Sequence, residues 1–271
     1  MMSMEKKSFF DMQIDYDISD VVPYINWDYF FFAWGMHNKP EAEKQKLRKE
    51  AEQALDTLHG TYQTHALFII TPAHSEGDDV LIAGHRIPFL RQQQPESQLL
   101  CLADFVHPVD DKLGIFATSV DIGLETDFTH DAYQKMMVQL LADRLAEATA
   151  ERMHQEVRKT YWGYAPDEQL SMQELHAEQF QGIRPAVGYP SLPDTSLNFV
   201  IDQILDLHQI GIRLTESGAM KPHASVSGFT MSNAHARYFS LGKIGEDQLA
   251  DYAHRRGLPV VVMRKFLSTN L

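Results

Sequence analysis

The chain is 271 residues long, with 44% hydrophobic residues and a net charge of −13 at pH 7. This composition is ordinary for a globular protein with a substantial core, and no apolar run approaches the ~20 residues that a membrane-spanning helix needs. The acidic balance argues against a nucleic-acid partner, which requires a basic face, so we expect neither a nucleic-acid nor a membrane partner.

The N-terminal region lacks the pattern of a signal peptide, because Lys6 and Lys7 are not followed by a sustained apolar stretch. Apolar residues at helical spacing then predict an amphipathic helix over residues 41–58, which ends before Gly60. The missing signal pattern favours an intracellular protein, and we expect it in the cytoplasm.

Short apolar runs follow this helix and predict strands. Residues 66–71 and 80–83 predict a β-hairpin with a longish polar loop between them, and residues 98–103 and 113–120 continue the series. The single cysteine, Cys101, lies in one of these runs and cannot form an internal disulfide. We expect a buried, unreactive thiol in a reducing compartment.

The longest helix is predicted over residues 130–160, where apolar side chains recur at steps of three and four residues. Ser171 and Glu174 have the spacing of a capping box, which opens a short helix that we expect to end near Gln181. A further helix is predicted over residues 196–210.

Near the C-terminus, residues 224–231 and 237–241 predict two paired strands, and residues 245–256 predict a helix. The valines from Val260 onward favour a strand by propensity, whereas Pro259 suits the start of a helix. Hairpins and long helices mix without regular β–α–β alternation, so the fold class is α+β with a mainly antiparallel sheet.

The segment 182–190 has the most distinctive composition. Its prolines fix the backbone, its glycines permit a close approach of other groups, and Arg184 stands immediately before Pro185. A stiff, extended loop that carries one guanidinium group can bind a small anionic group such as a carboxylate. Taken alone, Arg184 could equally be a surface arginine that braces the loop.

This segment reads Arg-Pro-Ala-Val-Gly-Tyr-Pro and resembles the signature of the activation domain of cobalamin-dependent methionine synthase. Other segments agree with that family in order and spacing, from about Tyr24 to the C-terminus. They are residues 102–106, 141–148, 157–159, 161–166, 214–217, 224–228 and 248–253.

The resemblance implies a single C-shaped domain over residues 23–271, with a bent antiparallel sheet and flanking helices, preceded by an extension over residues 1–22. It also favours a helix at Val260. The family binds S-adenosylmethionine, and its pattern maps onto eight positions of this chain. These are Asn26, Glu147, Arg184, Ala186, Gly188, Tyr189, Tyr238 and Phe239.

Each position has an implied role. Arg184 corresponds to the arginine that pairs with the carboxylate of the cofactor, and the loop from Ala186 to Tyr189 follows the ligand with its backbone. Glu147 corresponds to an acid of the site. Tyr238 and Phe239 correspond to aromatic residues that close over it. Taken singly, Glu147 could be a solvated helix residue, and the two aromatic residues could be core residues of a strand.

One position departs from the family, because Asn26 stands where the family has an aspartate before its tryptophan. An amide cannot neutralise an ammonium group, so we expect weaker cofactor binding by roughly 5- to 30-fold unless Asp28 compensates. Phe239 replaces a tyrosine that is often found in the family.

The resemblance further implies a reactivation module that supports reductive methylation of cob(II)alamin to methylcobalamin. It implies no catalytic residue or metal ligand of its own, with cobalamin reached only through a partner protein. The expected partners are a cobalamin-binding methionine synthase lacking its own activation module, on which the chain acts in trans, and a flavodoxin-like electron donor. The alternative is a regulatory protein that caps a corrinoid protein or senses S-adenosylmethionine. In either case we expect no methionine synthesis by this chain alone.

Overall fold

The computed structural model describes residues 10–94 and 98–271. Its main sheet is antiparallel throughout, in the order β4-β3-β2-β5-β8, with β1 also paired to β2. The strands are β1 (Phe10–Asp17), β2 (Gln63–Glu76), β3 (Asp79–Ile82), β4 (His85–Pro88), β5 (Asp111–Val120) and β8 (Ser225–Thr230).

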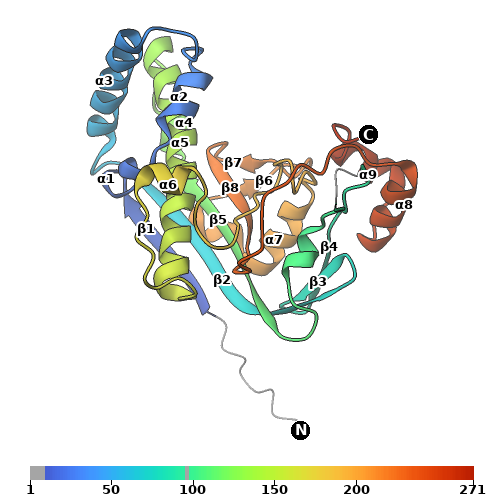
Figure 1. The fold of residues 1–271 in the computed structure, drawn as a ribbon. Coiled ribbons are helices and arrows are strands. Elements are labelled where there is room, and N and C mark those ends of the chain that lie inside the picture. The colour runs from blue at the N-terminus through green and yellow to red at the C-terminus, as the bar shows by residue number, and fades with distance from the viewer. Residues whose placement is uncertain (1–9, 95–97) are drawn as a thin grey trace.

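Strand β2 is the long axis of this sheet, and its two halves have different neighbours. Residues 63–70 pair with β1, and residues 73–76 pair with β3 along the same edge. Pro72 lies between these two segments and pairs with neither β1 nor β3. Its missing N–H therefore costs no hydrogen bond on that edge. The sheet bends along its length and gives the molecule its C shape (Figure 1).

Both faces of the sheet are covered, because side chains alternate between two hydrophobic cores. Phe68 and Phe116 point to the first core, and Ile69 and Ile115 point to the second. The first core is covered by α1 (Ile18–Val21), α2 (Trp27–Ala33), α3 (Glu41–Leu58) and α5 (Ala132–Glu156). The second is covered by α7 (Leu197–Leu205) and η4 (Leu207–Ile210).

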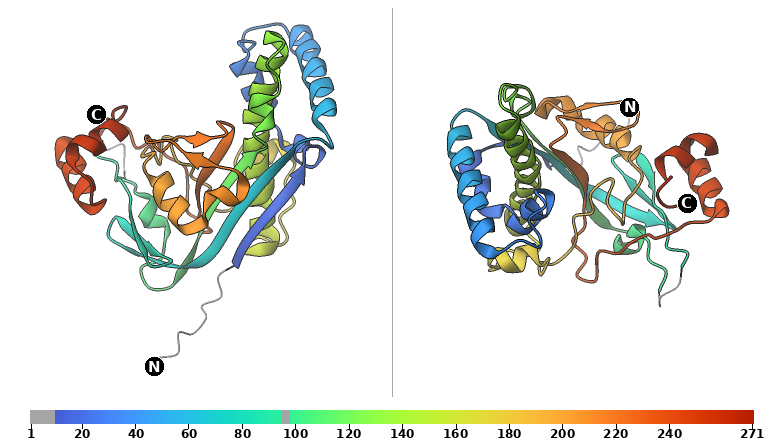
Figure 2. Two further views of the ribbon diagram at one scale, coloured as in Figure 1. Left: turned by 180° about the vertical axis from the view of Figure 1, so that it is seen from behind. Right: turned by 90° about the horizontal axis from the view of Figure 1, so that it is seen from above.

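The C-terminal helices α8 (Glu246–Arg255) and α9 (Val260–Phe266) form a third, smaller core at the end of the molecule opposite α2 and α3 (Figures 1 and 2). Polar contacts attach this unit to the rest. The Tyr252 hydroxyl donates to Asp194 over 2.8 Å, and both side chains are buried.

The remaining elements are short. They are η1 (Val22–Tyr24), η2 (Leu102–Phe105), α4 (Gly123–Thr126), the π-helical turn η3 (Val157–Tyr161), α6 (Met172–His176) and the ribbon of β6 (Arg213–Leu214) and β7 (Met220–Lys221).

The predicted α+β class and the bent antiparallel sheet are confirmed, as are the helices over residues 41–58 and 245–256. The long helix ends in the π-helical turn, and the capping box at Ser171 is present, although α6 ends at His176 and not near Gln181. The helix at Val260 is also confirmed.

Four expectations were wrong. The hairpin loop after residue 76 is a tight turn, because the strand continues through the polar residues up to Glu76. Residues 98–103 form only one bridge and a helical turn, which Asp104 caps by accepting from the Cys101 N–H. Residues 237–241 are not a strand; β8 pairs with β5. The helix predicted over 196–210 breaks at Asp206, whose backbone is left-handed.

The boundary between an extension and the domain at residue 23 stays a prediction. From Phe10 onward the segment contributes β1 to the sheet. Within the described part of the chain, no helix has both the length and the apolar character needed to cross a bilayer.

Candidate functional site

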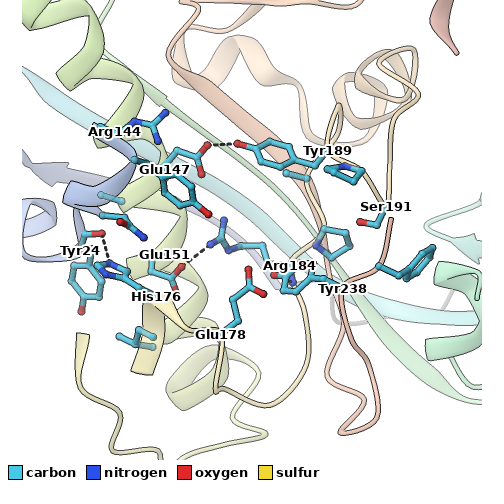
Figure 3. Close-up of a pocket in the computed structure, with 18 of the residues that line it drawn as sticks. Tyr24, Arg144, Glu147, Glu151, His176, Glu178, Arg184, Tyr189, Ser191 and Tyr238 are labelled. Atoms are coloured by element: carbon cyan, nitrogen blue, oxygen red, sulfur yellow. Dashed lines mark hydrogen bonds and ion pairs between the residues drawn. The ribbon is translucent and has the colours of Figure 1, made fainter. Parts of the chain in front are cut away.

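A cavity of about 680 Å³ lies between one face of helix α5 and the chain segments that face it (Figure 3). One wall is a single face of α5, where the lining residues recur at helical spacing: Arg144, Glu147, Ala148 and Glu151. The opposite wall comes from residues 184–191 and 238–240. The region of η1, α2 and α6 closes one end, through Tyr24, Asn26, Tyr29, Leu175, His176 and Glu178.

The segment from Ile183 to Val187 runs beside β8 as an extra extended strand. The Ile183 N–H donates to Met231 over 3.0 Å, and the Val187 N–H donates to Ser227 over 2.8 Å. Gly228 makes this approach possible, because a Cβ there would lie 2.1 Å from the Pro185 carbonyl oxygen. The sheet therefore fixes the backbone that carries Arg184.

Arg184 is buried in the floor of the cavity, where its Nη2 donates to Glu151 over 2.9 Å. Its backbone N–H donates to the Tyr238 hydroxyl over 2.8 Å. Burial acts to lower the pKa of Arg184, but the nearby carboxylates, Glu151 first, outweigh it and the pKa is raised. The guanidinium group therefore remains charged.

Glu147 and Tyr189 connect the two walls of the cavity. The Tyr189 hydroxyl donates to the Glu147 carboxylate, as the dashed line between them in Figure 3 shows. Burial, followed by the charge of Glu147, raises the pKa of Tyr189, so the phenol stays a donor.

Tyr238 and Phe239 line the cavity from a loop. Burial raises the pKa of Tyr238 to about 12. The Phe239 ring lies 6.5 Å from that of Phe105, centre to centre. The loop is attached to the arginine segment because the Leu241 N–H donates to the Pro190 carbonyl oxygen over 2.9 Å.

Asn26 is the N-cap of α2, where its side-chain oxygen accepts from the Asp28 N–H over 3.2 Å. It also lines the cavity, whereas Asp28 is exposed and does not. Asp28 therefore does not replace the carboxylate that position 26 lacks.

The structure brings seven of the eight predicted positions to this one cavity: Asn26, Glu147, Arg184, Ala186, Tyr189, Tyr238 and Phe239. Gly188 is not among the lining residues. It lies in the turn between Ala186 and Tyr189, with a φ of 91° and an N–H that donates to the Leu192 carbonyl oxygen over 2.8 Å.

Sequence reasoning missed other charged residues of the cavity, among them Glu151, Glu178 and Arg144. Glu151 and Arg144 could have been found, because they lie four residues after and three residues before Glu147 on one helix. Nothing in the local sequence marks Glu178.

Behind the cavity, Arg158 forms a fully buried ion pair with Glu168. Its Nε and Nη2 each donate to the carboxylate over 2.8 Å. The guanidinium group also lies over the Phe180 ring, 4.2 Å from its centre. This pair attaches the segment that carries α6 to the end of the long helix.

Residues 206–211 read Asp-Leu-His-Gln-Ile-Gly, which fits the Asp-x-His-x-x-Gly pattern of cobalamin ligands. Sequence analysis overlooked this match. The structure places it at the end of α7 and along η4, where Asp206 and His208 are exposed, and His208 does not line the cavity. A short pattern outside its structural context is weak evidence.

Comparison with known proteins agrees with the geometry. Residues 17–257 match the family model described as the vitamin B12 dependent methionine synthase activation domain. Among solved structures, the chain is similar to the crystal structure of the MetH reactivation domain bound to AdoHcy. The TM-score is 0.90 and the identity 37%, over 96% of this chain and 90% of that chain.

Proposed function

This chain belongs to the family of activation domains of vitamin B12-dependent methionine synthase, and from that premise we propose that it binds S-adenosylmethionine in the cavity and presents the methyl group to protein-bound cobalamin. The similar MetH domain was solved with AdoHcy, the demethylated form of this cofactor. The eight positions named above are the proposed cofactor-binding residues.

One observation carries the proposal: the cavity holds a buried donor and a buried acceptor that lack partners. Arg184 Nε and Glu151 Oε1 make no hydrogen bond with the residues that the structure describes. Buried polar atoms are rarely left unpaired. A carboxylate and an ammonium group on one carbon, as in the methionine part of the cofactor, would satisfy both.

The remaining positions suit the other parts of the ligand. Backbone groups from Ala186 to Tyr189 can follow its length, and Tyr238 and Phe239 offer aromatic faces to the adenosyl end or to a cation. Asn26 can offer a hydrogen bond at the methionine end, but no charge.

When bound, the cofactor supplies an electrophilic methyl group on a sulfonium sulfur, which a nucleophile displaces in line. The chain then needs no general base and no covalent nucleophile, because the nucleophile is the cobalt of the partner. Its contribution is to hold the methyl group in a fixed orientation at the cavity opening.

We further propose that the chain acts in trans in the cytoplasm, on a cobalamin-binding methionine synthase that lacks its own activation module, with a flavodoxin-like protein as electron donor. The lining of the cavity supports a methyl donor site, and His208 of the Asp-x-His-x-x-Gly match lies outside it.

The visible spectrum of the corrinoid tests this proposal. The chain is mixed with S-adenosylmethionine, an electron donor and a cob(II)alamin-loaded synthase from which the activation module has been removed. We expect conversion to methylcobalamin that depends on the chain. If the spectrum stays that of cob(II)alamin although both partners bind tightly, the trans role is wrong and the capping or sensing function replaces it.

A further inference from the structure

His176 ends helix α6 and lines the cavity at the same end as Asn26. Its Nε2 lies 3.1 Å from the Tyr24 carbonyl oxygen. Because a carbonyl oxygen can only accept, Nε2 carries a hydrogen and donates it, and in the neutral ring Nδ1 is then an acceptor. Within the described part of the chain Nδ1 contacts no donor, and it is not a buried atom. The ring therefore offers the cavity an acceptor that no residue uses.

The neighbours of His176 hold its ring in place. The Tyr24 hydroxyl donates to Gln155 of helix α5 over 2.7 Å, so the residue whose carbonyl group His176 contacts is itself fixed. In Figure 3 the ring meets the Tyr24 carbonyl group, and Glu151 lies on its Arg184 side. Nδ1 of His176 and the unpaired Oε1 of Glu151 therefore belong to one region of the cavity.

The ammonium group of the cofactor needs more acceptors than Glu151 provides. It has three N–H donors, and Glu151 Oε1 satisfies one of them. Asn26 adds no charge, and its side-chain oxygen already accepts from the Asp28 N–H over 3.2 Å. An imidazole nitrogen with a lone pair is a suitable further partner, since a bond from an ammonium donor is charge-assisted.

We propose, on the basis of the function proposed above, that His176 binds the ammonium group of the cofactor through Nδ1 and so offsets the missing carboxylate at position 26. Binding then depends on pH, because a protonated imidazole can no longer accept and repels the ammonium group. The charged side chains that line the same cavity are Arg144, Glu147, Glu151, Glu178 and Arg184.

The test is His176→Gln, titrated by calorimetry with S-adenosylmethionine at about pH 7.5 and about pH 5.5, on either side of the usual titration of histidine. A glutamine amide keeps a donor for the Tyr24 carbonyl oxygen but leaves no acceptor at the position of Nδ1. At the higher pH we expect the variant to bind about tenfold more weakly than wild type, as for loss of one charge-assisted contact. At the lower pH we expect the two affinities to agree within about twofold, because the imidazole no longer accepts. The other charged side chains of the cavity are common to both chains, so their titration cancels in this ratio.

A second variant supplies the missing charge. Adding Asn26→Asp to His176→Gln should return the affinity at the higher pH at least to that of wild type, since the new carboxylate binds the ammonium group. The melting temperature of His176→Gln should stay within about 3 °C of wild type, because the contact with Tyr24 is kept.

Affinity of His176→Gln within about twofold of wild type at the higher pH would overturn the inference. A loss of the same size at both pH values would overturn it as well, because His176 would then only hold η1 in place. Failure of the wild-type chain to bind S-adenosylmethionine at either pH would instead contradict the proposed function.

Discussion

Arg184 and Glu151 form an ion pair of 2.9 Å that joins the arginine loop to helix α5 at the floor of the cavity. The side chains are 10% and 13% exposed, so each is the main neutralising partner of the other. A mutation at either position therefore alters the fold as well as the site, because an unpaired buried charge is costly.

Arg184→Lys separates these two effects. Lysine keeps the positive charge next to Glu151 but loses the planar fork that suits a carboxylate. We expect S-adenosylmethionine to bind at least about tenfold more weakly, a loss of about 1.4 kcal/mol, while the melting temperature changes by only about 3 °C. Calorimetric titration and thermal unfolding measure the two quantities. If Arg184→Lys binds S-adenosylmethionine within a factor of about two of wild type, another residue binds the carboxylate of the cofactor.

Asn26→Asp should tighten binding. Aspartate can cap α2 as asparagine does, so the fold should not change. The added carboxylate restores a counter-charge for the ammonium group, and we expect a gain of roughly 5- to 30-fold in affinity that shrinks in high salt. Titrations at low and high ionic strength check this. Unchanged or weaker binding would mean that position 26 does not face the ammonium group.

Gly228→Ala should disrupt the site by displacing the arginine segment that pairs with β8. Its Cβ would lie 2.1 Å from the Pro185 carbonyl oxygen and 2.8 Å from the Ala186 Cα, so the arginine segment must move. We expect a loss of about 1–3 kcal/mol in the free energy of unfolding, together with weaker cofactor binding. Gly211→Ala is the control, since its Cβ meets no atom within 4 Å and only left-handed strain is added. It should keep cofactor affinity, and similar affinities for the two variants would refute the role given to Gly228.

Much of this fold could be predicted from periodic patterns and end signals. The helix at residues 41–58 and the capping box at Ser171 depend on local chemistry, so the sequence indicates them directly. The strand predicted over residues 237–241 was wrong because apolar and aromatic residues also occur in loops that line a cavity. The break at Asp206 has no glycine or proline to mark it.

The site was predictable only where it follows the family pattern or a helical face. Arg184 stands in a distinctive segment, and Glu147 and Glu151 share one face of α5. Glu178 reaches the cavity because α6 ends early and the chain turns through a left-handed residue. Such tertiary placement leaves no local signal in the sequence.

The buried pair of Arg158 and Glu168 offers a test of what supports the α6 segment. Glu168→Ala leaves a buried guanidinium without its partner and should cost about 3–5 kcal/mol in the free energy of unfolding. Replacing both residues, as Arg158→Met with Glu168→Leu, should cost less than the single change because no buried charge remains. Urea unfolding measures both variants. If Glu168→Ala lowers the free energy of unfolding by less than about 1 kcal/mol, the pair stabilises the fold no more than a surface salt bridge does.

Calorimetric titration of the wild-type chain measures directly whether this cavity binds S-adenosylmethionine. We expect one site per chain, competition by S-adenosylhomocysteine, and marked weakening in Arg184→Lys. Absence of binding, or binding that Arg184→Lys leaves unchanged, would contradict this expectation.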